Sequence, residues 1–397
     1  MKKLLSLVLA MSLALTLFAC GSKQASNTSS EEPATEAPAA EGATTFKIGG
    51  IGPTTGGAAV YGKSVENAIQ IAVDEINANG GINGYQVEYS FADDEHNAEK
   101  SVNAYNSLKD WGMQMLIGTV TSSPCIAVAD KTVADNMFQI TPSGSAVECV
   151  ANPNVFRMCF SDPNQGVASA QYINDHNLAK KVGIIYDSSD VYSSGITDKF
   201  REEAVGKNFE IVAEEQFTAD SKTDFTTQLT KIKSAGADLV FLPFYYSEAA
   251  LILEQAKKMD YKPIFFGCDG MDGILTLENF DTSLAEGLML LTPFSADATD
   301  DLTQSFVKKY QDKYGEIPNQ FAADGYDCAY TLKLAAEKAN LTPSSSTSDI
   351  CNALKSTITT ITQKGLTGDS ISWQADGEPN KTPKAVVIKN GAYVLAN

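Results

Sequence analysis

Short apolar runs rich in β-branched and aromatic residues alternate with longer segments of helical periodicity over most of the chain after residue 45. The run at 46–51 is followed by apolar residues at helical spacing in 63–79, where Asn79-Gly80-Gly81 has the composition of a helix C-cap. Repeated strand and helix patterns of this kind are typical of parallel sheets covered by helices. The sequence therefore predicts an α/β fold.

Two series of such elements predict two lobes. The first series predicts strands at 46–51, 86–92, 113–117 and 138–141, with helices at 63–79, 98–110 and 124–135. The second predicts strands at 181–186, 210–215, 238–242 and 263–266, with helices at 194–206, 225–235 and 248–259. Residues 302–339 should be mostly helical, and residues 385–395 should form a hairpin that turns at Lys389-Asn390-Gly391. About 350 residues follow residue 45, more than one core usually supports, so we expect two doubly wound parallel-sheet lobes.

The N-terminus has the pattern of an export signal. Met1-Lys2-Lys3 is basic, residues 4–18 are apolar but too short to span a bilayer comfortably, and Ala19-Cys20-Gly21 offers a small-residue cleavage site. Residues 17–20 resemble the bacterial lipobox, in which the cysteine becomes the acylated first residue. We therefore expect a lipoprotein signal peptide at 1–20 and lipidation of Cys20; an ordinary signal peptide with an incidental cysteine is the alternative.

Residues 21–45 contain no aliphatic side chain larger than alanine, so they cannot bury a core and should form a disordered tether. No later apolar run is long enough to cross a bilayer. We expect an extracytoplasmic protein that is held on the outer face of the cell membrane through Cys20.

Charge and missing motifs exclude several classes of function. The net charge of −19 argues against a nucleic-acid partner, because phosphate binding needs a basic surface. Only two histidines are present, and the sequence has no G-x-S-x-G, H-E-x-x-H or P-loop motif. The six cysteines after Cys20 are scattered without a C-x-x-C pair, which indicates neither a zinc site nor a redox motif. We therefore expect no enzyme activity, no cofactor and no metal.

In open α/β sheets, ligands bind beyond the carboxyl ends of the strands, so the strand-to-helix loops of the first lobe are the candidate site. The loop 52–62 is rich in glycine but does not complete G-x-G-x-x-G; its glycines let backbone approach a small ligand, with Tyr61 as a wall. In the loop 118–124, Pro124 suits the first helical position, so Ser123 should be the N-cap, with Ser122 just ahead of the free N–H groups. Hydroxyls and amides at a helix N-terminus make a carboxylate site, although both serines could serve only as caps.

Two further loops carry polar groups for the other end of a dipolar ligand. In the loop 141–145, Ser143 can offer its carbonyl, and Ser145 its hydroxyl and N–H. Asp269 follows an apolar strand of the second lobe within a glycine-rich loop, where it could pair with an ammonium group or serve as a turn residue.

The loops in order resemble the leucine/isoleucine/valine-binding protein family of ABC transporters. The resemblance runs from about residue 46 to the C-terminus and rests on Gly-Ala-Ala-Val-Tyr-Gly (57–62), Ala-Val-Asp-Glu-Ile-Asn-Ala-Asn-Gly-Gly-Ile (72–82), Phe-Ala-Asp-Asp (91–94), Ile-Gly-Thr-Val-Thr-Ser-Ser (117–123), Ile-Thr-Pro-Ser-Gly-Ser (140–145) and Phe-Gly-Cys-Asp-Gly (266–270). It implies a type I periplasmic-binding-protein fold with three crossovers between lobes. Lobe one would comprise 46–162 and 295–366, and lobe two 163–294 and 367–397.

The resemblance also implies roles for single residues. The Ser122 hydroxyl and the N–H groups of Ser122 and Ser145 would hold an α-carboxylate. The Ser143 carbonyl, the Ser145 hydroxyl and the Asp269 carboxylate would hold an α-ammonium. The positions that match the walls of the side-chain pocket are Tyr61, Tyr192, Tyr245 and Phe321.

Two departures from the family leave the ligand open. The disulfide of the best-known members would join the positions of His96 and Thr121, so that bridge is absent, and Asp269 replaces a longer glutamate. We expect a monomer that carries a branched-chain or other hydrophobic amino acid to a membrane permease of an ABC transporter. The alternatives are a binding protein for an amide, urea or aromatic carboxylate, or a ligand-presenting sensor component.

Overall fold

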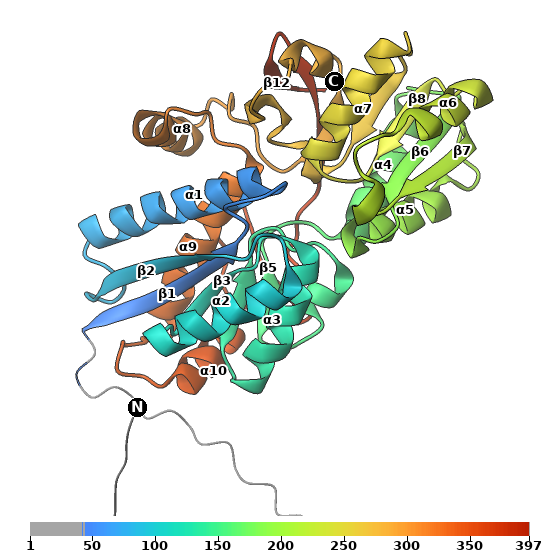
Figure 1. Cartoon of the computed structure of the whole chain (residues 1–397). Coiled ribbons are helices and arrows are strands. Elements are labelled where there is room, and N and C mark those ends of the chain that lie inside the picture. Colours follow the sequence, from blue (N-terminus) through green and yellow to red (C-terminus); the bar gives the residue numbers. More distant parts are fainter. Residues whose placement is uncertain (1–41, 43, 397) are drawn as a thin grey trace, which may run out of the picture. The chain divides into compact units, whose positions relative to one another are not determined.

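The computed structural model describes residue 42 and residues 44–396, and these contain two β-sheets (Figure 1). The first sheet is wholly parallel, with the order β2-β1-β3-β4-β5. Its strands are β1 Thr45–Gly52, β2 Gln86–Asp93, β3 Met115–Gly118, β4 Phe138–Thr141 and β5 Val155–Arg157. The predicted signal peptide, Cys20 and nearly all of the predicted tether lie outside the described residues.

Helices cover both faces of the first sheet because its strands are apolar on both sides. On β3, Met115 and Ile117 join the core under α1, α9 and α10, whereas Leu116 packs into the core under α2 and α3. Side chains alternate between the two faces of a strand, so a strand that is apolar at every position must be covered twice. The covering helices are α1 Ala59–Ala78, α2 Ala98–Trp111, α3 Ser122–Ala134, α9 Gln320–Lys338 and α10 Thr347–Ile358, and α8 Asp301–Tyr314 packs against α1.

The second sheet is mixed, with the order β12-β11-β10-β9-β8-β6-β7. Its strands are β6 Lys181–Asp187, β7 Glu210–Phe217, β8 Leu239–Leu242, β9 Ile264–Gly267, β10 Met289–Thr292, β11 Lys384–Lys389 and β12 Ala392–Leu395. On β8, Phe241 packs into the core under α4 and α5, and Val240 faces α6 and α7. These helices are α4 Asp162–Asp175, α5 Val191–Ala204, α6 Thr226–Ala235 and α7 Tyr246–Lys258.

The strands and helices predicted from periodicity are confirmed, with ends that differ by a few residues. The C-terminal hairpin is confirmed as β11 and β12, which pair antiparallel. Its two turn residues, Asn390 and Gly391, have positive φ values of 53° and 74°, as a type I′ turn requires. The prediction missed β5, β10, α4 and α10.

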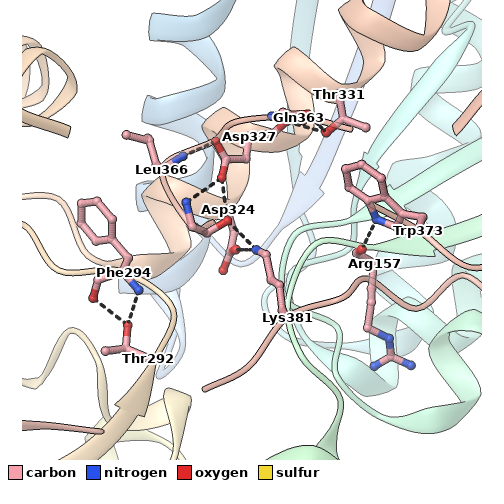
Figure 2. Close-up of polar contacts among 11 residues, drawn as sticks. Arg157, Thr292, Phe294, Asp324, Asp327, Thr331, Gln363, Leu366, Trp373 and Lys381 are labelled. Atoms are coloured by element: carbon pink, nitrogen blue, oxygen red, sulfur yellow. Dashed lines mark hydrogen bonds and ion pairs between the residues drawn. The ribbon is translucent and has the colours of Figure 1, made fainter. Parts of the chain in front are cut away.

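Three segments lead from the first sheet to the second or back, and Figure 2 shows contacts at each. After β5, the indole Nε1 of Trp373 donates to the carbonyl of Arg157 at 2.8 Å. After β10, the Thr292 hydroxyl and the backbone of Phe294 form a local turn, with Oγ1 donating to the Phe294 carbonyl at 3.0 Å. Before β11, the Lys381 ammonium lies 3.0 Å from the Asp324 carboxylate of α9, and both side chains are almost fully buried.

The resemblance implies that residues 367–397 belong to lobe two, and part of this stretch contacts the first sheet. The amide of Arg157 in β5 donates to the carbonyl of Gly377, and Gly377 packs against Val150 and Val155. These contacts place residues 371–378 beside the first sheet. The chain joins the second sheet only at β11, because strand pairing with β10 begins there.

A buried carboxylate holds the start of this third segment. Asp327 in α9 accepts hydrogen bonds from the amides of Leu366 and Thr367, at 2.8 and 2.9 Å, and from the Thr367 hydroxyl at 2.6 Å (Figure 2). Its side chain has no solvent exposure. The loop therefore depends on this single acceptor for three buried donors.

Asp327→Ala should lower the melting temperature by about 5 °C or more, because three buried donors lose their acceptor at a combined cost of roughly 3 kcal/mol. Thermal denaturation followed by circular dichroism measures the change. The matched control Asp327→Asn keeps one acceptor oxygen and should lose about half as much. Equal melting temperatures for Asp327→Ala and the wild type would contradict this role of the carboxylate.

Candidate ligand-binding site

Loops from both sheets meet around one small cavity. Those of the first lobe follow β3 and β4, and those of the second lobe follow β6, β8 and β9. Every predicted site residue except Ser123 lines this cavity, and Val120, Thr121 and Gly270 join them: the predicted ones are Tyr61, Ser122, Ser143, Ser145, Tyr192, Tyr245, Asp269 and Phe321. The placement fits the rule that ligands bind beyond the carboxyl ends of strands.

The start of α3 differs from the prediction. Thr121 is the N-cap, Ser122 is the first helical residue, and Ser123 is the second rather than the cap. The predicted N-cap was wrong because it assumed that Pro124 occupies the first helical position. Proline is also tolerated at later positions of the first turn, where the backbone N–H has no partner within the helix. As a result Ser122, not Ser123, presents its hydroxyl to the cavity.

The loop after β4 aims two amides at this hydroxyl. The N–H groups of Ser145 and Ala146 both donate to Ser122 Oγ at 3.2 Å. The Ser143 hydroxyl donates to the carbonyl of Val120 at 2.6 Å, which ties the loop to the end of β3. The first lobe therefore contributes a cradle of small hydroxyl side chains and backbone N–H groups, which we call the Ser122 cradle; it comprises Ser122, Ser143, Ser145 and Ala146.

The second lobe contributes a buried acid. Asp269 is 4% exposed, and its Oδ1 accepts a hydrogen bond from the Tyr192 hydroxyl at 2.7 Å. Burial raises the pKa of the Asp269 carboxyl to about 6, although the hydrogen bond from Tyr192 lowers it in part. A carboxylate that is desolvated in this way gains from a cationic partner more than an exposed one does.

Glutamine side chains hold the backbone of Asp269, and sequence reasoning missed both. Gln165 in α4 accepts from the Asp269 amide at 3.0 Å, and Gln320 at the start of α9 donates to the Asp269 carbonyl at 2.8 Å. Both glutamines are buried. Because Gln320 belongs to α9, the acid is held from elements of both lobes, which no local pattern could indicate.

Arg157 is a second residue that sequence reasoning missed. It is fully buried in β5, and its guanidinium donates to backbone carbonyls of the loop that carries Ser145. An arginine within the apolar run Val155-Phe156-Arg157-Met158 is a usable signal, since a charge inside a buried strand must find partners nearby.

Aromatic rings enclose the rest of the cavity. Tyr61 and Phe321 from the first lobe lie with ring centroids 4.3 Å apart, and Tyr192 and Tyr245 from the second stack in parallel at 5.1 Å. The Tyr61 hydroxyl donates to the Gly270 carbonyl, a contact between the lobes. The walls are therefore suited to an apolar group of modest size.

The position of the missing family disulfide is occupied by a hydrogen bond. His96 Nδ1 lies 2.9 Å from Thr121 Oγ1, and the imidazole packs edge-on to the ring of Tyr245. The sequence positions matched to the bridge are thus neighbours in space. The cysteines that the described residues contain are all buried free thiols.

With this geometry in hand, comparison with known proteins identifies the family. Residues 45–392 match the periplasmic binding protein family. The chain belongs to this family. It is 30% identical over 295 residues to the Leu/Ile/Val-binding protein BraC3 of Rhizobium johnstonii, a match that covers 74% of this chain and 79% of the relative. The resemblance to leucine/isoleucine/valine-binding proteins and the type I fold are therefore confirmed.

Solved structures of similar proteins have the same fold. The branched-chain amino acid transporter substrate binding protein LivJ of Streptococcus pneumoniae, in complex with isoleucine, superposes with a TM-score of 0.80 at 30% identity, covering 88% of this chain and 97% of LivJ. A solute binding protein of an ABC transporter from R. palustris, in complex with benzoate, has a TM-score of 0.78 at 20% identity and covers 89% and 96%, which shows the shared fold.

The family is one of solute-binding proteins and not of enzymes, as expected. It is also a family of extracytoplasmic proteins. Among the residues that the structure describes, no helix is both long and apolar enough to cross a bilayer.

Tyr192→Phe should raise the pKa of Asp269 from about 6 by at least roughly one pH unit, because the hydrogen bond that stabilises the ionised carboxylate is lost. Carbon-13 NMR titration of the aspartate carboxyl groups in ligand-free protein measures it, with Asp269→Asn used to assign the resonance. Tyr186→Phe is the matched control, since Tyr186 bonds to Gln216 and not to the cavity. An unchanged titration midpoint in Tyr192→Phe would disprove the expected coupling.

Proposed function

We propose that this protein binds a branched-chain or other hydrophobic L-amino acid between its lobes and delivers it to the membrane permease of an ABC transporter. The proposal is supported by the relatives, which include a Leu/Ile/Val-binding protein and a LivJ structure that contains isoleucine. The observation that carries it for this chain is the pairing of the Ser122 cradle with buried Asp269 across one cavity.

A zwitterion needs partners at both ends before it can leave water. An unpaired charge in a closed cleft costs several kcal/mol, so each pole must meet hydrogen-bond donors or an opposite charge. The Ser122 hydroxyl and the N–H groups of Ser122 and Ser145 supply donors for a carboxylate. The Asp269 carboxylate, with the Ser143 carbonyl and the Ser145 hydroxyl, supplies partners for an ammonium group.

The aromatic walls supply the remaining free energy. Burial of a leucine or isoleucine side chain against Tyr61, Tyr245 and Phe321 contributes about 1.5–3 kcal/mol. This contribution depends on buried apolar area and only weakly on branching, so the walls favour hydrophobic amino acids as a class.

Because the carboxylate partners belong to one lobe and Asp269 to the other, a bound amino acid would stabilise the closed arrangement. A ligand shifts a conformational equilibrium only through its different affinity for the two states, and here both poles are matched only when the lobes are together. A permease could then distinguish loaded from empty protein. Anchoring through lipidated Cys20 would keep the protein beside that permease, and a monomer suffices for this cycle.

An aromatic carboxylate is the second candidate, because a protein of the same fold has been solved with benzoate. An aromatic carboxylate would accept hydrogen bonds from the Ser122 cradle. It would, however, leave Asp269 without a cationic partner in a site where burial already disfavours the charge. The amino-acid ligand is therefore the better match to this chain.

Isothermal titration should show that L-leucine binds at least about tenfold more tightly than its des-amino analogue 4-methylpentanoate. Ser122→Ala and Asp269→Ala should each weaken leucine binding by at least about 1.5 kcal/mol, close to tenfold. Ser123→Ala is the matched control; its side chain lies outside the cavity, so we expect a change below about twofold. Equal affinities of 4-methylpentanoate and leucine would favour the carboxylate ligand instead.

Leucine affinity should fall about tenfold between pH 7 and pH 5. The ammonium group pairs with ionised Asp269, whose pKa is raised to about 6 by burial, so protonation below pH 6 competes with the ligand. Asp272 also titrates near pH 6, so Asp269→Asn is the required control: it should bind weakly but with little pH dependence. A wild-type affinity that stays constant from pH 7 to pH 5 would show that Asp269 does not meet the ligand's charge.

A further inference from the structure

Arg157 is a buried cation that lies behind the Ser122 cradle. It ends β5 next to the first crossing segment and has no solvent exposure. It does not line the cavity. A guanidinium in this setting needs fixed acceptors, because a buried unpaired charge is strongly unfavourable; Nη1 and Nη2 have them, whereas Nε has no hydrogen-bond partner among the described residues.

The acceptors are three successive carbonyls of the cradle loop. Nη1 donates to the carbonyls of Gly144, at 3.2 Å, and of Ser145, and Nη2 donates to the carbonyl of Ala146 at 2.9 Å. The planar fork of an arginine presents several donors in fixed directions, which a lysine cannot do. One side chain therefore contacts three successive peptide groups, and the amide of Asp162 adds a hydrogen bond to the Ser145 carbonyl at 2.9 Å.

The orientation of the carbonyls decides that of the amides. In a trans peptide unit the C=O of one residue and the N–H of the next point in opposite directions. Carbonyls of Gly144 and Ser145 that turn toward Arg157 therefore send the N–H groups of Ser145 and Ala146 the other way. Both of these N–H groups do reach Ser122 Oγ, each at 3.2 Å.

The C-terminal segment holds Arg157 in place. Its amide donates to the Gly377 carbonyl at 3.1 Å, its carbonyl accepts from Trp373, and Nη2 lies 3.2 Å from the carboxylate of Glu378. Figure 2 shows Trp373 against the backbone of Arg157, with the guanidinium extending away from it. The direction in which the N–H groups of Ser145 and Ala146 point therefore depends on residues more than 200 positions away in sequence.

We infer that Arg157 is the positioning residue of the carboxylate site: its guanidinium turns the loop so that the N–H groups of Ser145 and Ala146 donate to Ser122 Oγ, which directs the Ser122 O–H toward the ligand's carboxylate. This rests on the proposed function and adds to it the way in which the Ser122 hydroxyl is oriented. Arg157 does not contact the ligand. It acts on one end of the ligand and leaves recognition of the ammonium group to Asp269.

The test compares ligands that differ only at the carboxylate. In isothermal titration of the full chain, Arg157→Lys should weaken L-leucine at least about tenfold but L-leucinamide less than about threefold, since the amide depends less on charged-group hydrogen bonds. Asp269→Asn is the matched control and should weaken both ligands by a similar factor, because both carry the ammonium group. A general structural defect would likewise weaken both equally, so an unchanged leucine-to-leucinamide ratio in Arg157→Lys overturns the inference.

A second variant keeps the test open if Arg157→Lys does not fold. Glu378 is about a third exposed, with its side chain at 29%, so Glu378→Gln should be tolerated. It leaves the guanidinium on the carbonyls but removes the ion pair that helps to hold it, so leucine should bind at least about twofold more weakly, with leucinamide nearly unchanged. A leucine affinity that does not fall, or that falls equally with leucinamide, contradicts the inference.

Failure of the proposed function has a different signature. If the wild type binds no leucine but binds benzoate, the amino-acid ligand is wrong, and the same variants are measured with benzoate and benzamide, where Arg157→Lys should again lower the ratio. If the wild type binds none of these four probes, the carboxylate site itself is disproved, and the role of Arg157 falls with it.

Discussion

The desolvation of charge in a closed cleft is the constraint on which the rest of this structure depends. A dipolar ligand can enter only if each of its poles meets fixed partners, and this chain places those partners on separate lobes. Asp269 lies on a loop of the second sheet, and the Ser122 cradle lies on loops of the first. In the proposed function the hinge between the lobes would therefore be part of recognition, because neither half of the proposed site is complete alone.

The two halves of the site are built in different ways. The acid is held by side chains around it, with Tyr192 on its carboxylate and Gln165 and Gln320 on its backbone. The cradle is formed largely by backbone groups: the Arg157 guanidinium donates to carbonyls on one side of the loop, and the N–H groups of the loop point to the other side. A backbone cradle accepts a carboxylate whatever the rest of the ligand is. This is consistent with one fold serving both isoleucine and benzoate in solved relatives.

Support for the cradle comes from the far end of the chain. Trp373, Gly377 and Glu378 belong to the last crossing segment yet contact Arg157 in the first sheet. Asp327 and Lys381 hold the two ends of the same segment. The segment therefore links the hinge to the orientation of the loop that would bind the carboxylate, through hydrogen bonds that are almost all buried.

The sequence by itself determined the two α/β lobes and the loops that carry the site, because apolar periodicity and the position of a loop after a strand are local properties. Resemblance to a family added Tyr192, Tyr245 and Phe321, which no local pattern distinguishes from core residues. The N-cap at Thr121, the packing of residues 371–378 and the roles of Arg157, Gln165 and Gln320 were decided only by the tertiary structure. Each depends on which distant donors and acceptors meet in a buried space, and that pairing is set by the packing of the whole chain, not by spacing along it.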